Sequence, residues 1–367
     1  MKVLCQREQL REGLAVVTGV IPLKSTRPAI ENVCLVVTDN ALELVGTDLE
    51  VAIRYRLDED VKVEEPGTTL VPARVIAEFV RDLSGETVSL ETIDERCHVK
   101  SGLDHCELVT QDADEFPVVP RFDDTDCMPV QGGTFTRLVS RTAFAAAREP
   151  GRYAMHGILA LVEEDCLRMV ATDGRRLAIA SSPIDVANPV PRRAIIPTKG
   201  MQLFGKVIDD PLEMVQVSFG EAQVGLKTRR AEMFARQIEG EFPRYATVIP
   251  STSSNSCEAD AEVLLKKLRL VSNVTAADTR AVRLSFTKDQ MGVRARSAAC
   301  GEANAQLEVK YNGEESEIAF NPDYLMEGLK NCERDVVQLD FNERTAPGKF
   351  TLGENYIYVV MPITIDP

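Results

Sequence analysis

Two short clusters of metal-ligating residues are the first feature of this sequence that could carry chemistry. Cys97-His98 and His105-Cys106 place two thiols and two imidazoles within ten residues. A structural zinc site needs four such ligands converging on one point. Residues 101–104 predict a turn between two strands, and neighbouring residues on a strand face opposite sides. At most one member of each pair then points the same way, so we predict no metal site.

Motifs of catalysis and nucleotide binding do not occur either. The sequence contains no GxxxxGK[ST] phosphate loop, no GxSxG nucleophile elbow and no HExxH zinc motif. The remaining histidine, His156, is expected to be packed or partly exposed. The acidic residues are spread through the chain, whereas a nuclease would need them clustered around a metal. These absences agree with what the family resemblance given below implies, a protein that is not an enzyme and that uses no cofactor.

Composition defines the class of protein. The chain has 367 residues, of which 44% are hydrophobic, enough for two to three domains with cores of their own. It has no 18-residue apolar run, and its first residues turn charged too soon for a secretory signal. Nine cysteines are scattered singly, which is typical of reduced thiols. We expect a cytoplasmic protein without a membrane partner.

An internal repeat of about 125 residues organises the elements. Four sets of residues share this period: the Thr-Asp pairs 47–48 and 172–173 with Ser297 at the next interval; Pro72, Pro197 and Pro322, each before a helical pattern; the strand-like runs 33–37, 158–162 and 283–286; and Glu-Phe-Pro at 115–117 and 241–243. Proline suits a helix start because its missing N–H would be unpaired there. A period of this length is that of a whole domain.

The repeat predicts an α+β fold of three tandem similar domains: residues 1–127, 128–253 and 254–367. The polar segments 120–133 and 250–256 are expected to be linkers. Each domain should contain two helices and about eight mostly antiparallel strands. The six expected helices span residues 7–17, 73–83, 134–148, 198–208, 261–273 and 322–332.

Positive charge is concentrated on these helices. The chain carries a net charge of −15, yet the six segments together carry +6 and the remainder −21. A charge run on one helix is usually a solvated face, but five of the six segments are neutral or positive. An acidic protein cannot hold DNA firmly by neutralising phosphates. A closed hole lined by the helices could nevertheless retain a duplex and let it slide.

The size of such a hole can be checked from helix packing. Twelve helices from two copies, spaced about 9–10 Å apart, form a circle near 36 Å across at their axes. Subtracting a helix radius of about 5 Å on each side leaves an opening of roughly 26 Å. That opening accommodates a duplex whose major groove is about 12 Å wide.

With these patterns the sequence resembles the bacterial sliding clamp family, the beta subunit of DNA polymerase III. The resemblance runs from Met1 to about Ile365. Its most specific stretches, in order, are VGTDLE (45–50), VPAR (71–74), ATDGRRLA (171–178), FPRY (242–245) and YVVMPI (358–363). The resemblance implies a DNA-clamp fold with three domains per chain. Two such chains would close head to tail into a dimeric ring with the helices inside.

The resemblance implies a DNA polymerase processivity factor that encircles duplex DNA without sequence specificity. Its implied partners are a second copy of itself, a clamp loader, the DNA polymerase III alpha subunit and other DNA polymerases, mismatch-repair proteins and ligase. Its implied location is the bacterial cytoplasm, in association with the nucleoid. Loading would need a separate ATP-driven machine, since this chain has no nucleotide loop.

The resemblance also implies a pocket for partner peptides between the second and third domains. The matching positions are Met155, Thr172, Gly174, Arg175, Arg176, Leu177, Pro243, Val248, Val360, Met361, Pro362 and Ile363. Methionine and aliphatic walls adapt to several ligands, although Leu177, Val248 and Val360 are also what an ordinary core would contain. Arg175 replaces the histidine of many relatives, Thr247 replaces a common basic residue, and the chain continues to Pro367. These departures bear on affinity and motif preference.

For DNA, the family's contacts match Lys24, Arg74, Arg148, Arg152, Tyr153, Lys199, Lys206 and Arg280. They would touch backbone or a stacked base without reading sequence. For Arg280 a solvated surface residue is the simpler interpretation. At the dimer interface, Cys106 and Leu108 would meet Leu270 and Val271 of the other copy. Cys106 stands where many relatives have an aromatic residue, so this interface should rely more on ion pairs.

Another class of protein fits part of the same pattern. An acidic interaction scaffold could use three domains to bind proteins and never DNA. Such a scaffold can be monomeric, whereas half-rings must associate, so the mass in solution separates the two. A trimeric clamp of the eukaryotic type is disfavoured because that design has two domains per chain.

Overall fold

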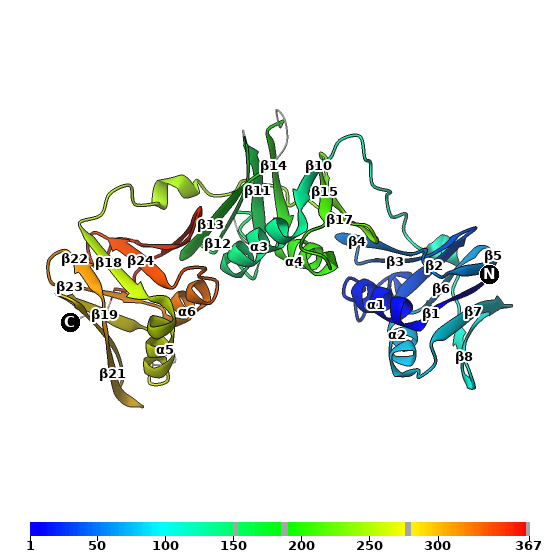
Figure 1. The fold of residues 1–367 in the computed structure, drawn as a ribbon, viewed down its shortest axis with the longest axis horizontal. Helices are drawn as coiled ribbons and strands as arrows, with labels where there is room; N and C mark the ends of the chain where they lie inside the picture. Colours follow the sequence, from blue (N-terminus) through cyan, green and yellow to red (C-terminus); the bar gives the residue numbers. More distant parts are fainter. Residues whose placement is uncertain (150, 152, 164, 185–189, 276–279, 365–367) are drawn as a thin grey trace. The chain divides into compact units, whose positions relative to one another are not determined.

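A computed structural model describes residues 1–149, 151, 153–163, 165–184, 190–275 and 280–364 (Figure 1). This part of the chain forms six α-helices and 26 β-strands, and its strands pair antiparallel. The class is α+β, as the sequence predicts. In the described residues no helix is long and apolar enough to cross a membrane.

The chain divides into two compact units. The first unit comprises Met1–Thr136 with Lys199–Gln237, and the second comprises Arg137–Thr198 with Ile238–Pro367. The division runs through the predicted central domain, because each half of that domain continues the sheet of a different neighbour. Strand β17 (Ala231–Arg236) pairs with β4 (Val51–Leu57), and β13 (Arg176–Pro183) pairs with β26 (Tyr356–Val360) (Figure 1).

The first unit contains two sheets. A five-stranded sheet has the order β5 (Lys62–Glu65), β1 (Lys2–Gln6), β7 (Thr87–Ile93), β8 (Arg96–Ser101) and β9 (Asp104–Val109). An eight-stranded sheet has the order β10 (Met128–Gln131), β15 (Met214–Phe219), β16 (Gln223–Lys227), β17, β4, β3 (Ala41–Thr47), β2 (Asn32–Thr38) and β6 (Gly67–Pro72).

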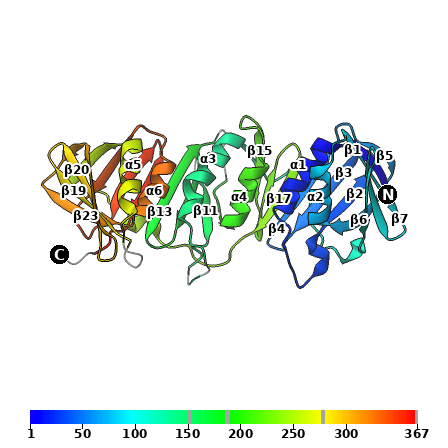
Figure 2. The same ribbon diagram turned by 90° about the horizontal axis from the view of Figure 1, so that it is seen from below.

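Two helices of the first unit lie side by side, α1 (Arg7–Thr18) and α2 (Ala73–Asp82) (Figure 2). Helix α1 buries Leu10, Leu14 and Val17, which recur at helical spacing, and packs this face against β3 and β4. Two further helices, α3 (Gly132–Thr142) and α4 (Thr198–Val207), belong to the central third of the chain.

The second unit has the same construction. A nine-stranded sheet has the order β14 (Arg192–Pro197), β11 (Gly157–Glu163), β12 (Cys166–Thr172), β13, β26, β25 (Gly348–Gly353), β24 (Val336–Phe341), β18 (Asn255–Asp260) and β22 (Lys310–Asn312). A four-stranded sheet has the order β21 (Gly301–Glu308), β20 (Gln290–Ser297), β19 (Val282–Thr287) and β23 (Ser316–Phe320). Helices α5 (Ala261–Ser272) and α6 (Pro322–Lys330) pack against each other.

The predicted repeat is visible in the strand order. Each third of the chain contributes two three-stranded meanders: β2-β3-β4 and β7-β8-β9, then β11-β12-β13 and β15-β16-β17, then β19-β20-β21 and β24-β25-β26. The strand-like runs of the sequence fall on the first strand of the first meander in every third. Two strand pairs join neighbouring thirds of the chain: β17 pairs with β4, and β26 pairs with β13. In each pair, the first-named strand ends the second meander of its own third, and the other strand ends the first meander of the preceding third.

The repeated Thr-Asp pair makes the turn that precedes this pairing strand. Asp48 Oδ1 accepts hydrogen bonds from the N–H groups of Glu50 and Val51. Asp173 Oδ1 accepts the corresponding bonds from the N–H groups of Arg175 and Arg176. Aspartate is favoured at such turns because its side chain satisfies backbone donors two and three residues on. In the last third, Ser297 stands at the position of the threonines, and its Oγ accepts from the N–H groups of Ala299 and Cys300.

Two sequence expectations need correction. The helix expected over residues 134–148 ends at Thr142, whose hydroxyl donates back to the carbonyl of Leu138, and a 3₁₀ turn follows at Ala143–Ala145. Such back-bonding by a β-branched residue weakens a helix. The linkers are also shorter than expected, because β10 begins at Met128 and β18 begins at Asn255.

The first linker is held against the sheet of the first unit. Arg121 makes two hydrogen bonds of 2.7 and 2.8 Å to the buried carboxylate of Glu43. The backbone N–H of Phe122 donates to Glu232. A buried carboxylate requires such partners because its desolvation is costly. The segment is therefore anchored, although its composition is that of a loop.

All nine cysteines are free thiols, as expected for a reduced chain. Burial raises the pKa of Cys5, Cys97 and Cys257 to about 12. At neutral pH these three groups are therefore protonated as well as inaccessible, and thiols react as thiolates. Cys300 is exposed.

We expect iodoacetamide at neutral pH to modify Cys300 first and to leave Cys5, Cys97 and Cys257 unmodified in the folded chain. The measurement is peptide mass spectrometry after timed labelling, and Cys300→Ser is the control for the fast site. Denaturant should make all nine thiols reactive. Rapid labelling of Cys97 in the folded protein would contradict the fold of the five-stranded sheet.

Candidate functional site

The turn between β12 and β13 holds four of the twelve residues of the predicted peptide pocket. Thr172 Oγ1 donates to the carbonyl of Arg176 and accepts from the N–H of Gly174. Gly174 has a φ of +83°, and a Cβ placed there would meet no atom within 4 Å. Glycine is therefore needed at this position for its backbone conformation and not for space. The turn aims Arg175 outward and Arg176 inward.

Arg176 is buried at 8% exposure and fully engaged within the second unit. Its guanidinium forms ion pairs with Asp173 and Glu327 and donates to the carbonyl of Phe144 at 2.6 Å. It also lies 4.5 Å from the ring centroid of Tyr324, a cation–π contact. Burial is the largest single influence and works against the charge, but the hydrogen bonds and charge interactions with Glu327 and Tyr358 together outweigh it, and the pKa of Arg176 is raised. Arg176 thus connects the β12–β13 turn to helix α6 within the second unit.

The chain's last described residues run beside this turn. The N–H of Met361 donates to the carbonyl of Arg175 at 2.8 Å, and the N–H of Ile363 donates to the carbonyl of Ala319 at 2.8 Å. Val360 pairs with Arg176 in the sheet and is fully buried, whereas Met361 is 40% exposed. Pro362 and Ile363 are half-buried. The segment therefore presents Met361 to solvent from a fixed backbone.

An apolar cluster lies behind the remaining predicted residues. Its buried members include Ala154, Leu177, Phe242 and Val359, and Tyr245 and Ile249 pack against it. The N–H of Ala154 donates to the carbonyl of Glu241, which holds the segment before β11 against the segment carrying Pro243. Met155 and Pro243 are half-buried beside it, and Val248 is 43% exposed.

These positions separate into two roles. Leu177, Val360 and Arg176 are buried and form part of the unit's own core. For Leu177 and Val360 this is the alternative interpretation given in the sequence analysis. Arg175, Val248 and Met361 are exposed, and Met155, Pro243, Pro362 and Ile363 are half-buried. The second group leaves apolar surface and one guanidinium accessible on the same unit.

Sequence reasoning missed the residues that position the two arginines. Tyr324 at the start of α6 raises the pKa of Arg175 through a side-chain hydrogen bond and stacks on Arg176. Glu327 reaches Arg176 across 151 positions of sequence. A surface pocket in the second unit is lined by Arg176, Asn321, Tyr324 and Glu327. No periodicity links α6 to the β12–β13 turn, so only the fold reveals this contact.

The residues predicted to contact DNA divide between the two units. In the first unit Lys24, Arg74, Lys199 and Lys206 are exposed, and in the second unit Arg148, Tyr153 and Arg280 are exposed. Lys24, Arg74, Arg148 and Lys206 make no ion pair with any residue that the structure describes. Lys199 pairs with Asp48, and Arg280 pairs with Asp323 at 2.8 Å. Arg152 lies outside the described residues.

Arg141 corrects the charge count of the helices. It was included in the positive charge of the segment 134–148, but its side chain is 7% exposed and pairs with Glu333. Its guanidinium also lies 5.1 Å from the ring centroid of Tyr356. Burial lowers the pKa of Arg141. This arginine connects α3 to the third domain and adds no free surface charge.

The predicted dimer residues are not equally available. Leu270 on α5 is 58% exposed, and Cys106 on β9 is half-buried. Leu108 is 5% exposed, and Val271 has no exposed surface because it lies on the inner face of α5. Val271 therefore does not fit a direct contact with a partner, and Leu270 is the residue of this pair that does.

Models of one family match nearly the whole length of the chain. They are the N-terminal domain of the DNA polymerase III beta subunit at residues 1–120, the central domain at 129–244 and the C-terminal domain at 246–364. Three such domains in tandem, with antiparallel sheets and few helices, define the fold. The chain belongs to the DNA polymerase III beta subunit family.

Relatives of this family are named for their action. The chain is 30% identical over 368 residues to the beta sliding clamp of Escherichia coli K12, with all of both chains covered. It is 30% identical over 365 residues to the beta sliding clamp of Pseudomonas putida KT2440, covering 98% of this chain and 99% of that one. This chain is therefore a non-catalytic processivity clamp of DNA replication.

Solved structures agree with this membership. The DNA polymerase III subunit beta of Pseudomonas aeruginosa superimposes with a TM-score of 0.94 at 28% identity, covering all of both chains. The DNA polymerase sliding clamp of Bacillus subtilis gives a TM-score of 0.96 at 24% identity, which supports the fold.

We expect Arg176→Ala to lower the free energy of unfolding of the second unit by about 3–5 kcal/mol, because it leaves two carboxylates without their partner. Arg175→Ala, at the adjacent exposed position, should change it by less than about 0.5 kcal/mol. Urea unfolding followed by circular dichroism measures both. Equal effects of the two substitutions would contradict the buried role of Arg176.

Proposed function

We propose that two copies of this chain close head to tail into a ring that encircles duplex DNA and slides along it. In this proposal the chain consists of clamp domains 1–127, 128–253 and 254–367. The clamp acts in the cytoplasm at the nucleoid, after a clamp loader has opened it. It tethers the DNA polymerase III alpha subunit, and in turn other polymerases, ligase and mismatch-repair proteins.

The pattern of paired and unpaired strand edges supports ring closure. At both junctions within the chain, the last strand of a second meander pairs with the last strand of a first meander. The last strands of the two remaining meanders are β9 and β21, and each ends its sheet with no further neighbour among the strands that the structure describes. Pairing β9 of one copy with β21 of the other would repeat the same junction. Unpaired edges of this kind favour pairing with another chain.

Side chains near these edges favour a contact of modest apolar area. Cys106 and Leu108 lie on β9, and Leu270 lies on α5, which packs against β21. His105 and Glu107 alternate with them on β9, and Glu302 and Glu308 are exposed on β21. A cysteine contributes less buried area than an aromatic ring would. Polar and charged groups should therefore contribute much of the specificity.

Weak DNA attraction suits a ring. Lys24, Arg74, Arg148 and Lys206 keep their charge unpaired among the described residues, while Arg141, Lys199 and Arg280 are compensated. The chain's overall charge of −15 repels a polyanion at a distance. A few free cations touching phosphates position a duplex without fixing a sequence. Retention must then come from topology.

The exposed part of the predicted pocket supports partner binding. Met361 and Val248 are exposed, and Met155, Pro243, Pro362 and Ile363 are half-buried on a rigid apolar base. Arg175 stands at this surface with its backbone carbonyl held by Met361. A short peptide ending in hydrophobic residues could bury its side chains here and direct its polar groups to Arg175. Polymerase and repair partners would compete for this one surface.

We expect the clamp to remain on nicked circular DNA after loading with a bacterial clamp loader and ATP, and to leave when that DNA is cut once. Linear DNA offers a free end, and only a topological link is lost by cutting. The measurement is gel filtration of labelled clamp with DNA before and after cutting. Equal retention on both forms would refute encirclement, and a monomeric mass in light scattering would favour the scaffold alternative.

We expect Met361→Ala with Pro362→Ala to weaken binding of a polymerase-derived peptide at least about tenfold, since a buried apolar side chain contributes about 1.5–3 kcal/mol. Fluorescence anisotropy measures this affinity. Leu212→Ala, at a 76% exposed position of the first unit, is the matched control and should bind normally. Light scattering should give the same mass for all three proteins. Unchanged peptide binding in the double variant would remove the pocket assignment.

A further inference from the structure

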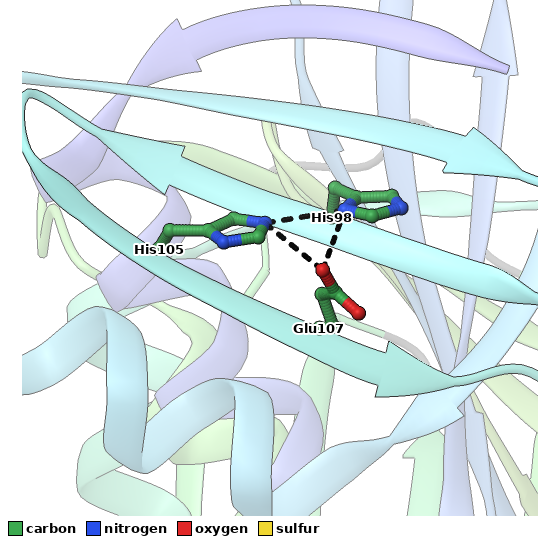
Figure 3. A group of neighbouring side chains, drawn as sticks. All are labelled: His98, His105 and Glu107. Carbon is green, nitrogen blue, oxygen red and sulfur yellow. Dashed lines mark hydrogen bonds and ion pairs between the residues drawn. The ribbon is translucent and has the colours of Figure 1, made fainter.

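Three side chains with metal-ligand atoms meet on the two outermost strands of the five-stranded sheet. His98 lies on β8, and His105 and Glu107 lie on β9 (Figure 3). The hairpin turn between the strands places Gly102 first, with a φ of +58°. Two-residue turns of type II′ take glycine at this position. The register that follows sets His98 opposite Glu107, with His105 diagonally adjacent.

The other face of the same strands explains why the cysteines take no part. Cys97 pairs with Leu108 and Cys106 pairs with Val99, so both thiols lie on the side that faces the core. The alternation predicted from the sequence is therefore correct for the four residues it considered. It did not consider Glu107, which shares the outer face with both histidines because it lies two positions beyond His105.

The three ligand atoms are close enough to share one ion. His98 Nδ1 lies 3.1 Å from His105 Nε2 and 3.7 Å from Glu107 Oε1. His105 Nε2 lies 3.9 Å from Glu107 Oε1. Ligands bound to tetrahedral zinc at about 2.0–2.1 Å are separated from one another by about 3.3–3.4 Å. The observed separations differ from this by a few tenths of an ångström, within the reach of side-chain rotation.

The rings must rotate to bind an ion. The two imidazoles are nearly coplanar, with an interplanar angle of 4° and a centroid distance of 5.4 Å. His98 Nδ1 and His105 Nε2 face each other, with the Glu107 carboxylate beside them (Figure 3), so rotation of the rings would turn both nitrogens toward an ion between them and the carboxylate. His98 is only 17% exposed, so β8 and β9 restrict its position, while Glu107 and His105 stay accessible at 45% and 39%. Access and partial pre-organisation are thus combined.

We propose that His98 Nδ1, His105 Nε2 and Glu107 Oε1 bind one Zn²⁺ ion, with water completing the coordination. Two imidazoles and one carboxylate form a donor set that zinc accepts with three protein ligands and an open fourth position. Such a nitrogen-rich set disfavours magnesium and calcium, which prefer oxygen ligands. The assignment does not require DNA binding, and His105 and Glu107 lie on β9, the strand proposed above to pair with a second copy.

Neighbouring charges set the balance at this site. Glu107 supplies one negative charge, and Glu91 lies opposite His98 on β7, where it pairs with Lys2. Lys100 lies opposite His105, and its exposed ammonium opposes a second cation nearby. Bound zinc would join β9 to β8 through side chains and so stiffen the edge of the sheet. Substituting Lys100 should then favour the ion, and it provides a control on the same face.

The test is zinc binding by the full chain. Chelator-treated protein is dialysed against zinc alone, and bound metal is measured by plasma mass spectrometry. We expect the wild type to bind one zinc ion more than the double variant His98→Ala with His105→Ala. Glu107→Gln should lower the zinc affinity by more than about tenfold, the loss typical of substituting a residue that only supports a ligand. Lys100→Ala should retain or improve binding. Equal zinc uptake by the wild type and the double variant would overturn the proposal.

Cobalt separates this site from the free thiols. Co²⁺ bound to the proposed ligands gives only weak visible absorption, whereas a thiolate ligand adds an intense near-ultraviolet charge-transfer band. We expect the weak bands in the wild type and in Cys300→Ser, and their loss in the double histidine variant. The opposite result would be a charge-transfer band that persists in the double variant and disappears in Cys300→Ser, with no weak bands in any of the proteins. That result would assign the binding to the thiol and refute this site. Circular dichroism confirms that each variant is folded.

Discussion

Edge-to-edge pairing of β-strands is the interaction on which the rest of this structure depends. Strand β17 joins β4 and strand β13 joins β26, so sheets run continuously from one third of the chain into the next. Backbone hydrogen bonds of this kind do not depend on particular side chains, which lets three diverged repeats use the same junction. The compact units of the chain therefore follow the sheets and not the repeats.

Ionic contacts reinforce the junctions of the second unit. Arg141 connects α3 to Glu333, and Arg176 connects the β12–β13 turn to Glu327. Each guanidinium also lies against a tyrosine ring, that of Tyr356 or Tyr324. Buried charges are costly unless every partner is present, so such pairs specify one arrangement more than they add stability. Arg141 and Arg176 are thus engaged within the fold, whereas the guanidinium of the neighbouring Arg175 stays exposed.

The sequence predicted what is local or repeated. Pro72 directly precedes α2, Pro322 begins α6, and the Thr-Asp pairs form the same turn twice, because each of these features depends on residues within one turn of chain. What it missed depends on distant residues. The sequence could not reveal that Tyr324 contacts both Arg175 and Arg176. The covered side of α5 was in contrast predictable, because Leu264, Leu268 and Val271 recur at helical spacing, and assigning Val271 to the dimer contact overlooked this pattern. Glu107 was overlooked for another reason: the predicted turn over residues 101–104 sets it opposite His98, but only the cysteines and histidines were considered as ligands.

The two unpaired edges, β9 and β21, have a consequence for assembly. They are different strands, so a copy that joins another through one of them still offers the other. Heterologous contacts of this type generate closed rings when the rotation between copies completes a circle, and open helical filaments when it does not. In the proposed ring, the angle imposed at each junction would be what prevents polymerisation. A substitution that opened this angle without weakening the contact would then favour an open filament over the closed ring.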